Sequence, residues 1–233
     1  ISLEKAASIR TSAMFLAPLL ARRGEAIIPN PGGCRIGARP IDRIVKGIEK
    51  MGVNVIYNSK DGYFYLTSKD RMKSINYKFE KNTHTGTETL ILASVLARGE
   101  TILDNAAEEP EVSELINLLN LMGANVRRVN RRKIIINGVS KLHGAKFRIL
   151  PDRNEIVTFA IAAIITKGDI FIKDIDTKGL EEFLDILKKA GGGFEKKNNG
   201  IRFYYINGVS PTNITTSFYP GFMTDWQGPW LIL

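Results

Sequence analysis

The only cysteine of the chain, Cys34, lies in a segment that also holds three glycines and two arginines, 31–42 (PGGCRIGARPID). Glycines let the backbone approach a bound molecule closely, and neighbouring cations favour the reactive thiolate over the thiol. The two guanidinium groups also suit a phosphorylated partner. The pattern makes Cys34 a candidate nucleophile or acid, and a small buried cysteine in an ordinary turn is the alternative.

A second segment, 81–88 (KNTHTGTE), combines a cation, three hydroxyls and a glycine just before an apolar helical run. The backbone N–H groups at the start of a helix bind anions. Together with Lys81 they could hold a diphosphate. Ordinary capping of the helix by Thr85 or Thr87 is the alternative.

Two further side chains could move protons. His84 is a candidate base, with an ordinary exposed loop histidine as the alternative. Because His84 and His143 are the only histidines, we expect no histidine-based metal site, and the sequence indicates no cofactor. Asp225, in the junction 220–225 (PGFMTD), is a carboxylate at a place where ligands could converge. Capping of the next helix by Thr224 or Asp225 is the alternative.

These candidates belong to a chain that repeats itself. Gly52, Gly123 and Gly191 stand 71 and 68 residues apart, and each closes an apolar helical run, as glycine often does after a last helical turn. In each copy a first helix and strand are predicted (12–28, 87–103, 156–172), then a second helix (41–51, 112–122, 180–190), then a pair of strands (53–57 with 63–67, 125–129 with 133–137, 194–196 with 201–206). We also expect a further strand to close each copy, for example at 147–150.

The helical runs are so apolar, as in 159–165 (FAIAAII), that they belong inside, with sheets packed around them. The sequence therefore predicts an α+β fold of repeated units of about 70 residues, arranged around a pseudo-threefold axis with helices inside and sheets outside. We place most of one domain in 1–150 and the start of a second in 151–233. Ile1 is not a methionine and the chain is most hydrophobic where it stops, so we expect a piece of a longer protein.

Composition limits the class of protein. A hydrophobic share of 44% fits a soluble chain with a sizeable core, and a single cysteine excludes an internal disulfide. No apolar run approaches the roughly 20 residues of a membrane span, so we expect a cytoplasmic protein that binds no membrane. The net charge of +9 attracts anions. Its basic clusters, such as 127–133, are short and lack interleaved aromatics, so we expect no nucleic-acid surface.

Together these motifs resemble the UDP-N-acetylglucosamine enolpyruvyl transferases (1-carboxyvinyltransferases). The resemblance covers essentially the whole chain and rests on four motifs: PGGC with IGARP (31–34, 36–40), EPE (109–111), PDR (151–153), and PGF with TD (220–222, 224–225). It implies the enolpyruvyl transferase-like fold, an inside-out α/β barrel built of repeated βαβαββ units, with two domains of three units each. It also implies transfer of the enolpyruvyl group of phosphoenolpyruvate to the 3′-hydroxyl of UDP-N-acetylglucosamine with release of phosphate, the first committed step of peptidoglycan synthesis.

The same resemblance implies roles for single residues. Cys34 matches a proton donor that forms an adduct with phosphoenolpyruvate and is alkylated by fosfomycin, and Asp225 matches the general base near the sugar hydroxyl. Arg39 matches a contact to substrate phosphate, and Arg10 another arginine of the substrate site. The uridine end is expected at Arg39, Pro40, Ile41, Asp42 and Arg43, and the diphosphate at Lys81, Asn82, Thr83, His84 and Thr85.

Some features depart from the family pattern. Its N-terminal Lys-Asn pair would lie upstream of Ile1 and the rest of the second domain beyond Leu233, so we expect these residues alone to be incomplete as a catalyst. Met14 and His84 differ from the residues usual in better-known members, and 226–228 (WQG) replaces a more usual Met-Gln-Ala. The alternatives are a 3-phosphoshikimate 1-carboxyvinyltransferase-like enzyme, against which the cysteine loop argues, a non-catalytic UDP-sugar-binding paralogue, and a nucleic-acid binder. The oligomeric state stays open.

Overall fold

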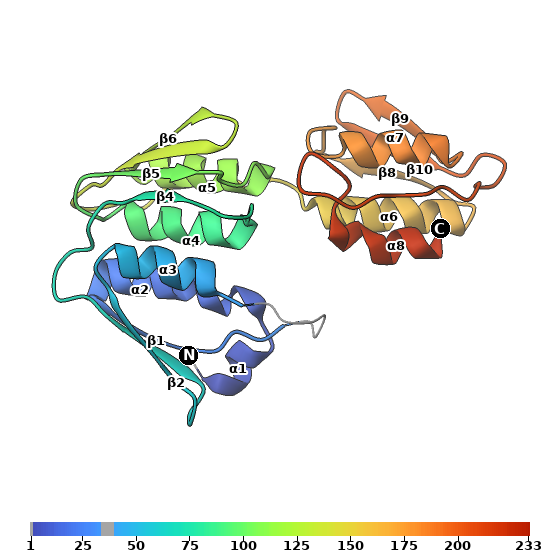
Figure 1. Ribbon diagram of the computed structural model, residues 1–233. Helices are drawn as coiled ribbons and strands as arrows, with labels where there is room; N and C mark the ends of the chain where they lie inside the picture. The colour runs from blue at the N-terminus through green and yellow to red at the C-terminus, as the bar shows by residue number, and fades with distance from the viewer. Residues whose placement is uncertain (1, 34–39) are drawn as a thin grey trace. The chain divides into compact units, whose positions relative to one another are not determined.

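The computed structural model describes residues 2–33 and 40–233, and the chain divides into two compact units, 1–147 and 148–233 (Figure 1). In the first unit, one copy of the repeat runs through α1 (Leu3–Ala7), the 3₁₀ helix η1 (Arg10–Phe15), α2 (Leu16–Arg23), β1 (Glu25–Pro29), α3 (Asp42–Lys50), β2 (Asn54–Asn58) and β3 (Tyr63–Thr67). The next runs through β4 (Asn76–Lys78), α4 (His84–Ser94), β5 (Glu100–Asp104), α5 (Pro110–Leu121), β6 (Asn125–Asn130) and β7 (Lys133–Asn137).

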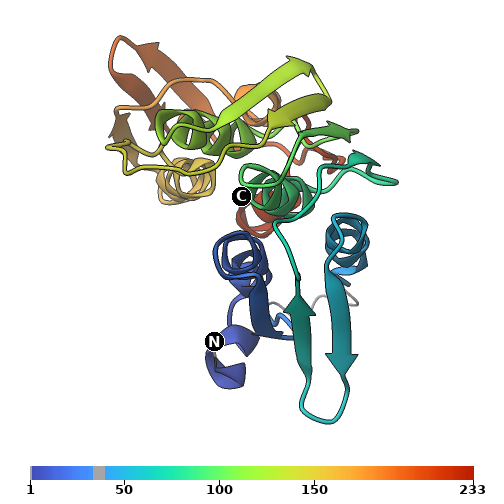
Figure 2. The same cartoon turned by 90° about the vertical axis from the view of Figure 1, so that its left-hand side faces the viewer.

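The two copies share a three-stranded antiparallel arrangement, β1-β3-β2 in one and β5-β7-β6 in the other, and the second sheet has β4 as an additional strand. The strand orders are β1-β3-β2 and β4-β5-β7-β6, and only β4 pairs in parallel, with β5, among these strands. Helices α2 to α5 lie between the two sheets (Figures 1 and 2). The predicted arrangement of inner helices and outer sheets is therefore confirmed in this unit.

The second unit contains one copy, followed by the beginning of another. Its elements are α6 (Arg153–Ile165), β8 (Asp169–Lys173), α7 (Glu181–Lys189), β9 (Gly193–Lys197), β10 (Gly200–Tyr204), η2 (Thr224–Trp226) and α8 (Gln227–Ile232). The sheet has the order β8-β10-β9. Phe183, Phe222, Trp226 and Trp230 pack edge to face in its core, with ring centroids 5.3–6.4 Å apart.

The glycines that define the repeat take the predicted backbone conformation. Gly52, Gly123 and Gly191 have φ of 88°, 93° and 89°, and each follows a helix that ends within two residues of it. A left-handed residue stops the helix because it turns the chain away from the helical axis.

One predicted strand is wrong. No ladder forms at 147–150, and Ile149 is 78% exposed. Arg148 of this segment forms an ion pair with Asp174, the residue after β8, with Nη2 and Oδ2 3.5 Å apart. The place of 147–150 at the end of a copy suggests a closing strand, but a strand also needs a paired edge, and the described backbone around 147–150 makes no such pairing.

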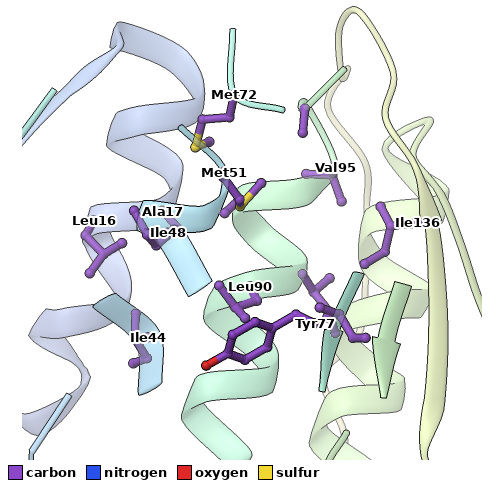
Figure 3. Close-up of a cluster of buried hydrophobic side chains, with 14 of the residues drawn as sticks. Leu16, Ala17, Ile44, Ile48, Met51, Met72, Tyr77, Leu90, Val95 and Ile136 are labelled. Carbon is purple, nitrogen blue, oxygen red and sulfur yellow. The ribbon is translucent and has the colours of Figure 1, made fainter. Parts of the chain in front are cut away.

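The core of the first unit is centred on α4, which is buried on nearly all sides between α2, α3 and α5 (Figure 3). Gly47 of α3 makes the closest of these contacts, because a Cβ atom there would lie 2.7 Å from Cδ1 of Leu90. The equally apolar α6 is covered on fewer sides, by α8, η2 and its own sheet, and leaves Phe159 exposed. Helix α4 is thus internal as expected, and α6 packs on its sheet with one side exposed within the described residues.

Candidate functional site

A pocket of about 270 Å³ lies in the first unit, where η1, the start of α3 and the start of α4 meet. It is lined by Arg10, Ala13, Met14, Pro40, Ile41, Arg43, Ile44, Thr83 and Thr85. Six of these residues, Arg10, Pro40, Ile41, Arg43, Thr83 and Thr85, are predicted site residues. The fold thus brings together three predicted segments that are far apart in the sequence.

Both ends of the cysteine segment are held at Arg10. On one side Gly33, with φ 100°, lies so close that a Cβ there would stand 3.1 Å from Cβ of Arg10, and the N–H of Gly32 donates to the carbonyl of Ala6 at 3.2 Å. On the other side Nη2 of Arg10 lies 3.5 Å from the carbonyl oxygen of Pro40. Cys34 and Arg39 themselves fall in 34–39, outside the described residues. The structure therefore places the two flanks of this segment at the pocket rim.

The wall formed by α3 consists of Ile41, Arg43 and Ile44. Ile41 and Ile44 are buried, while Arg43 is half-buried, and its carbonyl accepts a hydrogen bond from the hydroxyl of Tyr77 at 2.9 Å. Asp42, another predicted site residue, is exposed at the first position of α3 and does not line the pocket. There it complements the positive end of the helix dipole.

The start of α4 is capped by Thr83, so the expected cap at Thr85 or Thr87 is wrong. Oγ1 of Thr83 accepts from the N–H of Gly86 at 3.3 Å, and Thr83 has the extended backbone of an N-cap residue. Thr87 serves the same turn differently: its hydroxyl donates to the carbonyl of Thr83 at 2.8 Å and accepts from the N–H of Ala107 at 3.0 Å. Thr85 remains a pocket-lining residue.

Lys81 and Asn82, which precede this cap, do not line the pocket. Lys81 is exposed, whereas Asn82 is only 8% exposed and its Nδ2 donates to the carbonyl of Ala106 at 3.3 Å. Asn82 therefore ties the start of α4 to the loop before α5.

His84 is not among the residues that line the pocket. Its Nε2 is 3.2 Å from Oε1 of Glu88, an ion pair when the ring is protonated, although the two groups are not aligned as a regular hydrogen bond. Burial lowers the pKa of His84, but the proximity of Glu88 and the charges of Glu109 and Glu111 outweigh it, so its pKa lies above the ordinary value.

Much of the basic cluster around 127–133 contacts the loop before α5. Glu108 accepts from Nε of Arg131 at 2.8 Å and from Nε of Arg132 at 2.6 Å, and Arg128 donates to the carbonyl of Ala107 at 2.8 Å. Burial raises the pKa of Glu108, but the hydrogen bonds from Arg132 and Arg131 outweigh it and the net pKa is lowered. These arginines fix the loop to the β6–β7 hairpin.

Asp225 belongs to the second unit, in η2, where it is exposed. The residue at the cap position is Met223 and no side chain caps η2, so the capping alternative for Thr224 or Asp225 is wrong. The neighbouring Trp226 is buried and its Nε1 donates to Oδ1 of Asn154 at 3.0 Å, which fixes η2 to α6.

Sequence reasoning missed Ala13, Met14 and Ile44 as wall residues. Helical spacing supplied a signal, because Arg10, Ala13 and Met14 stand three and four residues apart, as Ile41 and Ile44 stand three apart. Once one residue of such a set is placed in a site, the others follow.

None of the described helices is both long and apolar enough to cross a membrane.

The fold is that of the enolpyruvyl transferases. The crystal structure of the enolpyruvyl transferase NikO from Streptomyces tendae matches with a TM-score of 0.79 and 20% identity, over 94% of this chain and 52% of that one. EPSP synthase from Acinetobacter baumannii matches with a TM-score of 0.64 and 21% identity, over 84% and 46%. The family model of EPSP synthase (3-phosphoshikimate 1-carboxyvinyltransferase) matches residues 2–230, and the chain belongs to this family.

The curated relatives narrow the comparison to one enzyme of this family, and they confirm the resemblance predicted from the motifs. A UDP-N-acetylglucosamine 1-carboxyvinyltransferase of Koribacter versatilis is 42% identical over 232 residues, which are 100% of this chain and 53% of the relative. One of Acidobacterium capsulatum is 43% identical over 227 residues, 97% of this chain and 51% of the relative. The chain thus spans about half the length of the curated relatives it matches.

Proposed function

We propose that the chain is part of an enzyme that transfers the enolpyruvyl group of phosphoenolpyruvate to the 3′-hydroxyl of UDP-N-acetylglucosamine and releases phosphate. The observation that carries the proposal is the pocket in which Arg10, Arg43 and the start of α4 converge beside both flanks of the cysteine segment. Relatives with this activity in their names, matched over nearly the whole chain, support the choice of substrates. Because they are named for this reaction, we place the protein in the cytoplasm, in peptidoglycan synthesis and hence in cell shape and division.

The pocket suits one end of a nucleotide sugar. Arg10 and Arg43 supply positive charge, and the first N–H groups of α4 add the positive end of a helix dipole near Thr83 and Thr85. Ile41 gives an apolar surface for the uracil ring. We assign the uridine to the wall 39–43 and the diphosphate to the segment 81–85, in which Asn82 acts through its contact with Ala106.

The reaction needs two proton transfers in its first step. The 3′-hydroxyl oxygen bonds to C2 of phosphoenolpyruvate and loses its proton to Asp225, while Cys34 donates a proton to the methylene carbon C3. In the second step the C2–O bond to phosphate breaks, C3 loses a proton, and the double bond forms again in the product. Arg39 and Arg10 offset the phosphate charge as the tetrahedral intermediate forms and collapses.

The test uses fosfomycin and intact-mass measurement on the 233-residue chain, with and without UDP-N-acetylglucosamine. We expect one adduct, located on Cys34, that forms faster when the nucleotide sugar is present, and none in Cys34→Ser. An adduct rate that ignores the nucleotide sugar would argue against a shared site. Phosphate release from both substrates is then measured on protein extended to the length of its relatives, where turnover is expected.

A 3-phosphoshikimate 1-carboxyvinyltransferase-like activity is the second candidate, favoured by the description of the matching family model. The two candidates differ in the acceptor alone. Turnover with shikimate 3-phosphate and none with the nucleotide sugar would select it, whereas binding of the nucleotide sugar without turnover would favour a non-catalytic paralogue.

A further inference from the structure

His84 occupies an unusual place at the proposed site. It is the first residue of α4, and both of its neighbours, Thr83 and Thr85, line the pocket, but its own side chain does not. The imidazole lies instead beside Glu88, one turn further along the helix, with Nε2 and Oε1 3.2 Å apart, and it is only 34% exposed. The residue thus connects the pocket wall to a group of carboxylates behind it.

Those carboxylates come from two elements. Glu88 belongs to α4, while Glu109 and Glu111 stand at the start of α5 and act on His84 through their charge. Glu109 is 7% exposed, and its Oε2 is buried without a hydrogen-bond partner in the described part of the chain. Arg128 of β6 is the cation that acts on Glu109 from the hairpin side.

We propose that His84 is a positioning residue that couples proton uptake to the binding of an anionic ligand, a nucleotide diphosphate, at the start of α4. The inference rests on the proposed function of the pocket. When the imidazole is protonated, its charge offsets Glu88 and Glu109 next to the N–H groups that face the ligand. When it is neutral, these carboxylates oppose an anion that the helix dipole would otherwise attract.

The direction of the effect follows from linkage. A ligand that binds better to the protonated form raises the pKa of His84, and protonation raises the affinity for the ligand by the same factor. The pKa of His84 is already above the ordinary value in the free protein, so binding is strongest below it and weakens as pH rises through it. We expect the Kd for UDP-N-acetylglucosamine to rise by about three- to tenfold across that range.

The chain offers a direct measurement, because His84 and His143 are its only histidines. Their ring signals are followed by ¹H–¹³C NMR in the 233-residue chain from about pH 5.5 to 8.5, with and without saturating UDP-N-acetylglucosamine, and His143→Gln assigns them. We expect the pKa of His84 to rise on binding. The ligand's diphosphate diester remains ionised throughout, so it adds no titration of its own.

Two variants separate positioning from mere support of the fold. His84→Gln should bind with a Kd that no longer depends on pH in this range. Glu88→Gln should move the pH at which affinity changes to a lower value, because a charge that raises the pKa of His84 is lost. His143→Gln is the matched control and should keep the wild-type pH profile.

The outcomes are distinct. If UDP-N-acetylglucosamine binds and the pKa of His84 does not move, the inference is overturned while the proposed pocket stands. If the pH dependence of Kd persists unchanged in His84→Gln, the inference fails in the same way. If no binding is seen at any pH, both the inference and the assigned pocket are overturned.

Discussion

Replacing Gly47 with alanine would set two opposing effects against each other where α3 crosses α4. A Cβ atom at this position would lie 2.7 and 2.8 Å from the two methyl carbons of Leu90, which is fully buried. Carbon atoms in contact need about 3.5–4.0 Å, so the helices must separate by about 1 Å or Leu90 must leave its rotamer. Overpacking of this kind costs about 1–3 kcal/mol, whereas alanine in a helix gains about 1 kcal/mol over glycine.

We therefore expect Gly47→Ala to lower the free energy of unfolding, by up to about 2 kcal/mol. The change also reaches the pocket, because Arg43 stands one turn before Gly47 on α3 and Thr83 caps α4. A wider gap between the helices should raise the Kd for UDP-N-acetylglucosamine. Urea unfolding followed by circular dichroism and a binding titration measure the two effects.

Leu90→Ala provides the background that tests the cause. It should itself cost about 2–5 kcal/mol because it empties a buried site, but it removes both close contacts. In that background Gly47→Ala should stabilise the protein by about 1 kcal/mol, so the sign of its effect reverses. If Gly47→Ala stabilises both backgrounds equally, the steric reasoning is refuted.

Three further perturbations test the site. Gly33→Ala forces a side chain onto φ 100° and against Arg10, so we expect about 1–2 kcal/mol less stability and slower fosfomycin alkylation of Cys34; an unchanged alkylation rate would contradict this. Thr83→Ala should lower the free energy of unfolding by about 1 kcal/mol because the cap of α4 disappears, whereas Thr83→Ser should keep most of that stability. Equal losses in the two variants would mean that the hydroxyl is not the cap. The pKa of Glu108 is lowered in the folded protein, so its stabilising effect is full above its unfolded pKa and is lost as pH falls through the folded value. Glu108→Gln should therefore reduce the loss of stability at acid pH. A loss as large as in the wild type would count against a stabilising role for the ion pairs of Glu108 with Arg131 and Arg132.

The sequence predicts the repeat well because its signals are local. Gly52, Gly123 and Gly191 mark helix ends through a backbone preference that needs no partner, and the strand pair after each glycine alternates over a few residues. The strand expected at 147–150 fails for the opposite reason. Its apolar residues permit a strand, but a strand forms only if another edge accepts it, and that depends on residues far along the chain.

The candidate site also combines features that a local sequence signal reveals with features that only the fold determines. The resemblance to the enolpyruvyl transferases points to Arg10 and Arg43, whereas the hydroxyl groups just before an apolar helical run point to Thr83 and Thr85 without it. What the sequence does not reveal is which neighbour each side chain meets. Asn82 contacts Ala106, which lies 24 residues away, and Thr83 rather than Thr85 or Thr87 caps α4 because only the fold decides where the helix begins.

The distribution of charge explains why a chain with a net charge of +9 need not present one basic face. Arg131 and Arg132 are both engaged by Glu108, and Arg128 by the carbonyl of Ala107, so the densest basic run serves the loop before α5. The pocket instead draws on isolated arginines, Arg10 and Arg43, and on the dipole of α4. An anion held by so few charges is sensitive to one more, and we propose that the half-buried His84, which stands between the lining residues Thr83 and Thr85, supplies or withdraws that charge as it gains or loses a proton.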